Sequence, residues 1–358
     1  MDKKKRTVPG SYHVKKLLRV GKKQPKQLSD NNLPKITNET VDEHRKAVIK
    51  GAQKFVYPLK HSKHKIVSVT VIIIVAAIIS FMTFTLLSLY KFQSTSAFMY
   101  QVTKILPFPV ARIGSTFVSY EDYLFELRHY IHYFQTQQGV DFSSEQGKRQ
   151  LEDQRTKSLN NVIDYAYIKR IAKEKNINVT NKEVDDQIKQ LRVQNRLGSN
   201  NKVFKDVLKS YWGWSEADFW RSVKQQLLTQ KVLQALDTDA DKRANAALAA
   251  VKSGQDFGVV AKQYSDDTAT KDNGGQLGFL VSKNDNNIPP QTIEALYKLK
   301  PGETSGIINL GYGLEIVKNI GNDGDKIKAA RIFISYQDIN KYLNEYKDKD
   351  KAQVFIKA

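Results

Sequence analysis

The longest uncharged stretch of the chain, Ile66 to Tyr90, constrains everything around it. It contains 25 residues, of which nineteen are apolar and six are Ser or Thr. As an α-helix it would reach about 37 Å at about 1.5 Å per residue, enough to cross a hydrocarbon core of about 30 Å with some tilt. A cleaved signal peptide fits poorly, because its apolar core would be about 7–15 residues long after a short basic leader. We therefore expect residues 66–90 to be a transmembrane helix that anchors the chain.

The charges on either side of this stretch predict its orientation. Residues 1–65 carry 18 Lys or Arg against 5 Asp or Glu, so 13 of the 20 net positive charges precede the span. The rest of the chain has 39 basic and 32 acidic residues, a surplus of only 7. Basic flanking residues stay on the cytoplasmic side of a membrane. We expect a single-pass protein of the cell membrane with a cytoplasmic N-terminus and extracytoplasmic C-terminal domains.

The basic tail, residues 1–65, is expected to be disordered and cytoplasmic. Its Lys and Arg runs stand among Pro, Gly, Asn and Gln, a composition that buries too little apolar surface to fold alone. Attraction to anionic membrane lipid is its simplest role. An alternative is an envelope scaffold whose tail binds a cytosolic partner. The basic runs lack interleaved aromatic residues, so nucleic acid is not an expected partner.

Beyond the span, residues 91–109 are expected to form a stalk and residues 110–237 a helical domain. Two short strand-like runs flank Gly114-Ser115, and apolar residues at helical spacing then predict a helix over about 144–175. Two later sites match the capping box that begins a helix, at Thr180 with Glu183 and at Ser215 with Asp218.

The helical part carries a first resemblance. The segments VARIGSTFVSYEDY, KEKNINVTNKEVDDQI and ADFWRSVKQQLLTQKVL follow one another over residues 110–236. This series resembles the N-terminal chaperone domain shared by periplasmic and cell-surface foldases. The resemblance implies that the domain binds unfolded exported polypeptides.

A more specific series of motifs lies between residues 254 and 315. In order, the five motifs are Gly254-Gln-Asp-Phe257, Tyr264-Ser-Asp-Asp267, Gly274-Gly-Gln-Leu-Gly278, Lys300-Pro-Gly-Glu-Thr-Ser305 and Gly313-Leu-Glu315. The series resembles the parvulin family of peptidyl-prolyl isomerases. That resemblance implies an α+β fold, with a small antiparallel sheet surrounded by helices, and cis–trans isomerisation of X-Pro bonds without a cofactor.

The order of strands departs from the parvulin pattern. Parvulins begin with a strand that reads roughly Ala-Arg-His-Ile-Leu, and nothing similar precedes Asp239. Ala330-Arg-Ile-Phe-Ile-Ser335 instead follows the last strand, across a turn at 321–325 with the Gly, Asn and Asp content of a hairpin. We expect a circularly permuted parvulin-like domain over 238–336, followed by a C-terminal helix and strand over 337–358. The alternative is that 326–358 is an unrelated tail.

The resemblance also assigns candidate site residues. Parvulins place two histidines face to face beneath the substrate proline, and here Glu315 and Ile332 occupy those positions. Asp267, at a position that parvulins fill with Cys or Asp, is the catalytic candidate. The substrate-binding candidates are the apolar residues Leu277 and Ile288, Thr292 in place of the usual phenylalanine wall, and Tyr312.

Two functions follow from this altered site. Isomerising an X-Pro amide breaks no bond, so an apolar pocket beside a carboxylate could still accelerate it. With both histidines and the aromatic wall replaced, we expect a folding factor with weak isomerase activity. The alternative is a non-catalytic holdase that uses the parvulin block as a peptide clamp. Two histidine pairs, His61 with His64 and His129 with His132, each lack a third ligand, so no metal site is expected. The sequence indicates no oligomeric state.

Overall fold

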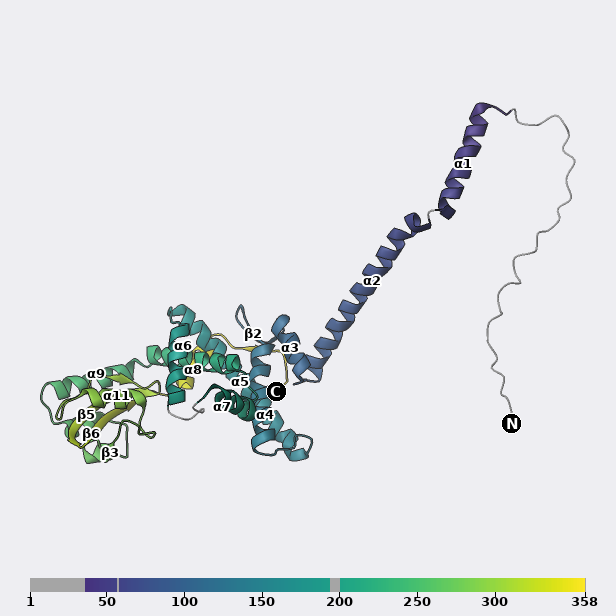
Figure 1. The fold of residues 1–358 in the computed structure, drawn as a ribbon. Coiled ribbons are helices and arrows are strands. Elements are labelled where there is room, and N and C mark those ends of the chain that lie inside the picture. Colours follow the sequence, from purple (N-terminus) through teal and green to yellow (C-terminus); the bar gives the residue numbers. More distant parts are fainter. Residues whose placement is uncertain (1–35, 57, 194–199, 358) are drawn as a thin grey trace, which may run out of the picture. The chain divides into compact units, whose positions relative to one another are not determined.

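The computed structural model describes residues 36–56, 58–193 and 200–357, and the chain forms two compact units, residues 1–80 and 81–358. The first unit contains helix α1 (Asn38–Val56) and most of helix α2 (Pro58–Leu86), both visible in Figure 1. The basic runs before residue 36 lie outside the described residues, as do the side chains of the His61 and His64 pair.

The expectation of a disordered tail is wrong for residues 38–56, which form α1. Val41, Val48 and Ile49 recur at helical spacing along it, and all three are exposed. At its start the Thr37 N–H donates to the Thr40 hydroxyl at 3.0 Å, and that hydroxyl donates to the Thr37 carbonyl at 2.9 Å. The composition of the whole tail conceals this segment, because the prolines and most glycines lie outside it.

One described helix, Lys65–Lys91, is long and apolar enough to cross a membrane, in agreement with the expected span. Its last turns, which include the π-helical segment η1 (Leu87–Lys91), belong to the second unit. Thr85 and Leu89 are fully buried there, and the Tyr120 hydroxyl donates to the Leu89 carbonyl at 2.6 Å. These residues of the apolar stretch contact protein, so the hydropathy of the stretch overstates the length available to lipid.

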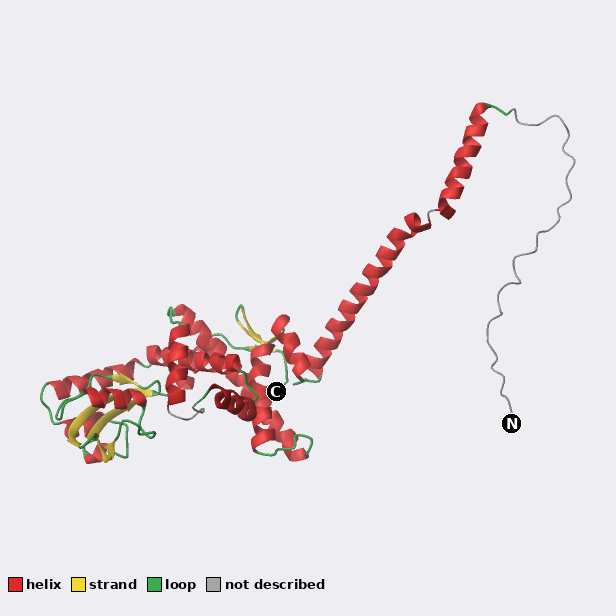
Figure 2. Ribbon diagram, in the orientation of Figure 1, coloured by secondary structure: helices red, strands yellow, loops and turns green. Residues whose placement is uncertain are grey.

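Helices dominate the first part of the second unit (Figure 2). They are α3 (Ala97–Ile105), α4 (Tyr120–Gln137), α5 (Glu145–Glu174), α6 (Asn181–Val193), α7 (Asn201–Val207), the π-helical η2 (Leu208–Trp212) and α8 (Glu216–Leu236). Helix α3 corrects the expectation of a stalk over 91–109. Met99 and Val102 of α3 are buried in the same core as α4 and α5, so this segment is part of the folded domain.

The helix starts agree with the predicted caps. The Ser144 hydroxyl accepts from the Gly147 N–H at 3.0 Å where α5 begins. At α8 the capping box of Ser215 and Asp218 is complete, and the Thr180 N–H donates to the Glu183 carboxylate at 2.8 Å before α6. Local side-chain chemistry therefore sets these boundaries.

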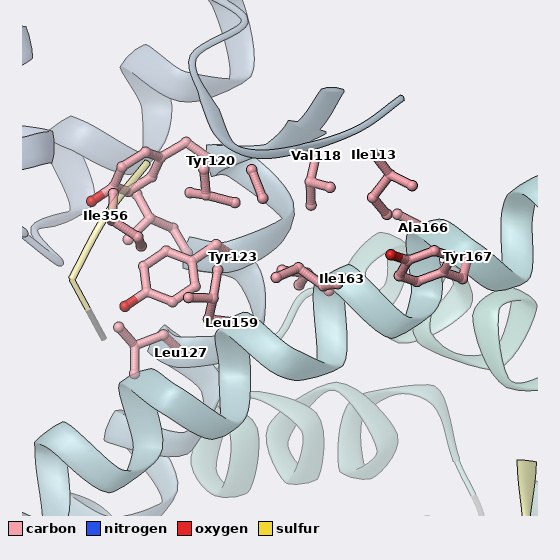
Figure 3. Close-up of a cluster of buried hydrophobic side chains, with 14 of the residues drawn as sticks. Ile113, Val118, Tyr120, Tyr123, Leu127, Leu159, Ile163, Ala166, Tyr167 and Ile356 are labelled. Carbon is pink, nitrogen blue, oxygen red and sulfur yellow. The ribbon is translucent and has the colours of Figure 1, made fainter. Parts of the chain in front are cut away.

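The core of the helical domain draws residues from both ends of the second unit. Figure 3 shows Tyr120, Tyr123 and Leu127 of α4 facing Leu159 and neighbouring residues of α5. Above them lie the strands β1 (Pro109–Ile113) and β2 (Thr116–Ser119), and Ile356 near the C-terminus reaches the same cluster. Strand β7 (Gln353–Val354) pairs with β1, which gives the sheet order β2-β1-β7.

The parvulin-like block lies in the sequence between α8 and the C-terminal segment that contains β7, and it has its own helices and sheet. Its helices are α9 (Thr238–Lys252), α10 (Phe257–Tyr264), the 3-10 turn η3 (Lys271–Asn273) and α11 (Pro290–Lys298). Its strands are β3 (Gln276–Val281), β4 (Ile308–Asn309), β5 (Gly313–Asp323) and β6 (Lys326–Ser335), in the antiparallel order β3-β6-β5-β4. Residues of α9 and α10 cover one face of this sheet, and residues of α11 cover the other. The α+β architecture agrees with the sequence analysis.

The strand expected from the C-terminal side does lie inside the sheet. Strand β6 pairs with β5 on one side and β3 on the other, and Leu314 to Asn319 lie opposite Ala329 to Ile334. The hairpin turn is tighter than expected, because only Gly324 and Asp325 separate the two strands. Gly324 has a φ of 60°, a conformation that glycine adopts without strain. The alternative of an unrelated tail is wrong.

After β6 the chain returns to the helical domain through α12 (Ile339–Lys349). Leu343 of α12 is fully buried in that core, and the Tyr167 hydroxyl donates to the Asp350 carbonyl at 2.6 Å. The point of return lies beside the point of departure, since the Gln337 N–H donates to the Asp237 carboxylate at 2.7 Å. Burial, together with a hydrogen bond to Asp237, raises the pKa of the Tyr342 hydroxyl to about 12.

This juxtaposition yields a prediction about the boundaries at 238–336. Deleting those residues and joining Asp237 to Gln337 through two or three Gly or Ser residues should leave a helical domain that unfolds cooperatively on heating, as monitored by circular dichroism. The matched control ends the chain at Asp237 and so removes α12 and β7 as well. That control should unfold at a clearly lower temperature, because it lacks Leu343 and Ile356 in its core. Equal stability of the two variants would contradict the insertion.

Candidate functional site

The candidate site lies on the face of the parvulin-like sheet that α11 covers. Four polar side chains meet there: Glu315 from β5, Arg331 from β6, Thr292 from α11, and Asp267 from the loop after α10. They come from four separate segments, and the pairing of β5 with β6 brings Glu315 and Arg331 together.

Glu315 is the most deeply buried acid of the group, with a side chain that is 0% exposed. Thr292 donates its hydroxyl to Oε2 at 2.5 Å, while Oε1 has no hydrogen-bond partner among the described residues. Burial raises the pKa of Glu315, and the Thr292 hydrogen bond and the Arg331 charge oppose that rise only in part. A carboxyl in this environment resists ionisation.

Arg331 connects the two acids. Its Nε donates to Asp267 Oδ2 at 2.8 Å, and its Nη1 lies 3.8 Å from Glu315 Oε1. Burial alone would raise the pKa of Asp267, but hydrogen bonds from Thr270 and Arg331 outweigh it, and the pKa is lowered. Asp267 is therefore the ionised partner of Arg331, and Glu315 lies beside the pair.

The expectation that Ile332 occupies a parvulin histidine position, facing Glu315, is wrong. In the observed register Ile332 pairs with Ile316, and Glu315 pairs with Phe333. Neighbouring residues of a strand point to opposite faces, so Ile332 points into the core formed with α9 and α10, where it is fully buried. The residue of β6 whose side chain reaches Glu315 is Arg331, one position earlier.

The double glycine of the parvulin-like motif has a clear role here. The Arg331 N–H donates to the Gly275 carbonyl at 2.8 Å, and a Cβ at Gly275 would lie 2.4 Å from the Arg331 carbonyl oxygen. Gly275 also has a φ of 77°. Only glycine allows this backbone to approach β6 so closely, which holds Arg331 in place.

A cleft opens beside this network. It has a volume of about 360 Å³, and Ile288, Tyr312 and Arg331 are among the residues that line it. The opposite wall comes from α6 and α8 of the helical domain. Leu277 does not line the cleft and instead packs with Ile288 against the apolar cluster beneath α11. Thr292 lies below the surface, 1% exposed.

The structure thus brings Asp267, Thr292 and Glu315 together and places Ile288 and Tyr312 at the opening. Sequence reasoning missed Arg331, although it stands in the quoted Ala330-Arg-Ile motif and one step in the alignment would have found it. It also missed the helical wall, for which no local signal exists. His129 stacks on Trp214 with ring centroids 4.4 Å apart, and His132 bonds the Ser210 carbonyl at 3.0 Å, so both imidazoles take part in packing.

Comparison with known proteins gives two family matches along the chain. Residues 59–233 match the SurA-like N-terminal domain family, and residues 227–321 match the PPIC-type peptidyl-prolyl isomerase domain family. The second match ends before β6, as expected for a block whose first strand has moved to its end.

Curated relatives and solved structures carry related names. The foldase protein PrsA of Caldanaerobacter subterraneus subsp. tengcongensis is 30% identical over 49% of this chain and 60% of its own length. PrsA of Clostridium botulinum strain Okra is 26% identical over 60% of this chain and 74% of its own length. A crystal structure of the peptidylprolyl isomerase PrsA from Bacillus anthracis is 22% identical, with a TM-score of 0.18, and covers 53% of this chain and 86% of that one. Within residues 59–321 this chain therefore consists of a SurA-like N-terminal domain followed by a PPIC-type parvulin domain, and it is a homologue of the PrsA foldases.

Proposed function

We propose that this chain is a membrane-anchored folding factor that holds exported polypeptides outside the cytoplasm. The observation that carries the proposal is the cleft, because one wall comes from the helical domain and the other from the parvulin-like block. A client segment in the cleft would contact both domains at once. The basic bias of residues 1–65 supports a cytoplasmic N-terminus.

Holding clients is the main activity in this proposal, and isomerisation is slow. The polar groups of the site are occupied with one another: Arg331 binds Asp267, and Thr292 binds Glu315. A rate gain requires groups that interact more strongly with the twisted amide than with the planar one. Arg331 favours some residual activity, because it lines the cleft and its guanidinium could donate to the carbonyl oxygen of a twisting X-Pro bond.

The holding activity predicts a graded result. Full-length protein in detergent should suppress the light scattering of a chemically denatured client on dilution. The variant that lacks 238–336 should suppress it less, because it retains only one wall of the cleft. If the deletion variant proves as effective as the full chain, the parvulin-like block takes no part in holding. If neither suppresses aggregation, the proposed function is wrong.

The orientation predicts a protease pattern. Protease added to intact cells, or to spheroplasts where an outer membrane is present, should digest residues 92–358 and spare an epitope tag placed at the N-terminus. A detergent-lysed sample is the control in which the tag must also be lost. Protection of the C-terminal domains with digestion of the tag would reverse the scheme.

The register predicts which substitutions restore catalysis. Arg331→His with Glu315→His places two imidazoles on neighbouring strands and on one face, so isomerase activity on a proline peptide should rise at least tenfold. Ile332→His with Glu315→His is the matched control. Its imidazole would enter the apolar core without a partner, at a cost of about 1–3 kcal/mol, so the unfolding temperature should fall with no gain in activity. Higher activity in the control would mean that the assigned register is wrong.

A further inference from the structure

The cleft has an unusual polar wall in its helical half. Four glutamines line it, Gln187 and Gln190 from α6 and Gln226 and Gln230 from α8. The two helices pack against each other, so the four carboxamides face one space. We name this set the glutamine wall.

The carboxamides of the glutamine wall are not used by the fold. Among the described residues, none of the four side-chain carboxamides forms a hydrogen bond. The carboxamide of neighbouring Gln234, by contrast, accepts one from the Asn309 side chain at 2.8 Å. Each carboxamide can donate two hydrogen bonds and accept two. The wall therefore presents both donors and acceptors to whatever enters the cleft.

The chemistry of the remaining lining limits the kind of ligand. Arg331 is the one charged side chain among the described residues that line the cleft, although the chain has a net charge of 20. The opposite wall is mixed, because apolar Ile288, Pro289 and Leu310 alternate there with the carboxamides of Asn286, Asn287 and Gln291. A ligand that suits this cleft is uncharged, carries alternating donors and acceptors along one edge, and has apolar groups on the other.

An extended polypeptide main chain has those properties. Its N–H and C=O groups repeat along one edge about every 6.6 Å, two residues at about 3.3 Å each. Gln226 and Gln230 are four residues apart on one helix, so their backbone positions differ by about 6 Å along its axis. Flexible side chains can absorb the small difference.

The backbone on the far side also allows a close approach. Gly311 lies between the cleft residues Leu310 and Tyr312, and a Cβ there would come 2.7 Å from the Gln230 carboxamide. Gly311 has a φ of 85°, which favours glycine. This glycine lets Gln230 reach across to the β4–β5 turn while its carboxamide stays unbonded.

We propose that the glutamine wall binds the main chain of extended client segments, so that clients are held with little regard to their side-chain sequence. This inference rests on the proposed holding function. It gives the contacts by which that function would accept clients of different sequence. The residues of the parvulin-like face supply apolar contacts to client side chains, and the carboxamides supply hydrogen bonds to the client backbone.

The test compares ligands that differ either in the order of their side chains or in the hydrogen-bonding groups of their backbone. A fluorescein-labelled uncharged twelve-residue peptide, a scrambled version, and a version N-methylated at alternate residues are titrated with full-length protein in detergent, and anisotropy gives Kd. Scrambling should change Kd less than threefold, whereas N-methylation should weaken binding at least tenfold. Equal binding of the N-methylated and unmodified peptides would overturn the inference.

A variant experiment assigns the effect to the wall. Replacing Gln187, Gln190, Gln226 and Gln230 with alanine should weaken binding of the unmodified peptide at least tenfold. The Kd values of the unmodified and N-methylated peptides should then be equal. Alanine is a good helix former, so α6 and α8 should persist, as thermal unfolding will verify. Gln146→Ala with Gln263→Ala, two exposed glutamines away from the cleft, is the control and should bind as the unaltered protein does.

The outcomes separate this inference from the proposed function. If the alanine variant holds clients and peptides unchanged, the glutamine wall is irrelevant while the holding function stands. If the unaltered protein neither binds peptide nor suppresses client aggregation, the proposed function fails, and the inference fails with it.

Discussion

The pairing of β5 with β6 is the contact on which the C-terminal half of the molecule depends. Ten residue pairs join the two strands, and β6 in turn gives β3 its only partner within the described sheet. Ile332 and Ile334 of β6 complete the core beneath α9 and α10, and Arg331 completes the candidate site on the opposite face. Without β6 the sheet would expose unpaired backbone groups and both apolar faces. Fold and site therefore depend on a strand that comes last in the block.

Much of this architecture could be predicted from the sequence because its signals are local. Helix α10 runs from Phe257 to Tyr264, between two of the quoted parvulin-like motifs, and the Ser215–Asp218 capping box marks α8. The placement of β6 could also be predicted, because a missing strand at one end and a matching one at the other admit one simple solution. In each case a few neighbouring residues carry enough information to set the structure.

The features that escaped prediction depend on contacts between distant residues. A one-residue difference in strand register moves a side chain to the opposite face, and the sequence did not distinguish Ile332 from Arg331 as the partner of Glu315. Helix α3 was expected to be a stalk because its burial depends on α4, and the end of the apolar stretch looked like lipid-facing helix although Leu89 is buried in protein. Hydropathy measures the apolar character of a segment and does not distinguish contact with lipid from contact with protein.

The hydrogen bond between Asp237 and Gln337 has a consequence for how this protein can change. The chain leaves the helical domain at Asp237 and re-enters it at Gln337, beside the point of departure. The block between these two residues therefore behaves as a large loop on the helical domain, which acts as an intact host. Its local unfolding would not separate Leu343 from α5 or β7 from β1. Substitutions in the inserted block, including those at Glu315 and Arg331, could thus accumulate without threatening the host core. The two domains are free to be selected for different properties.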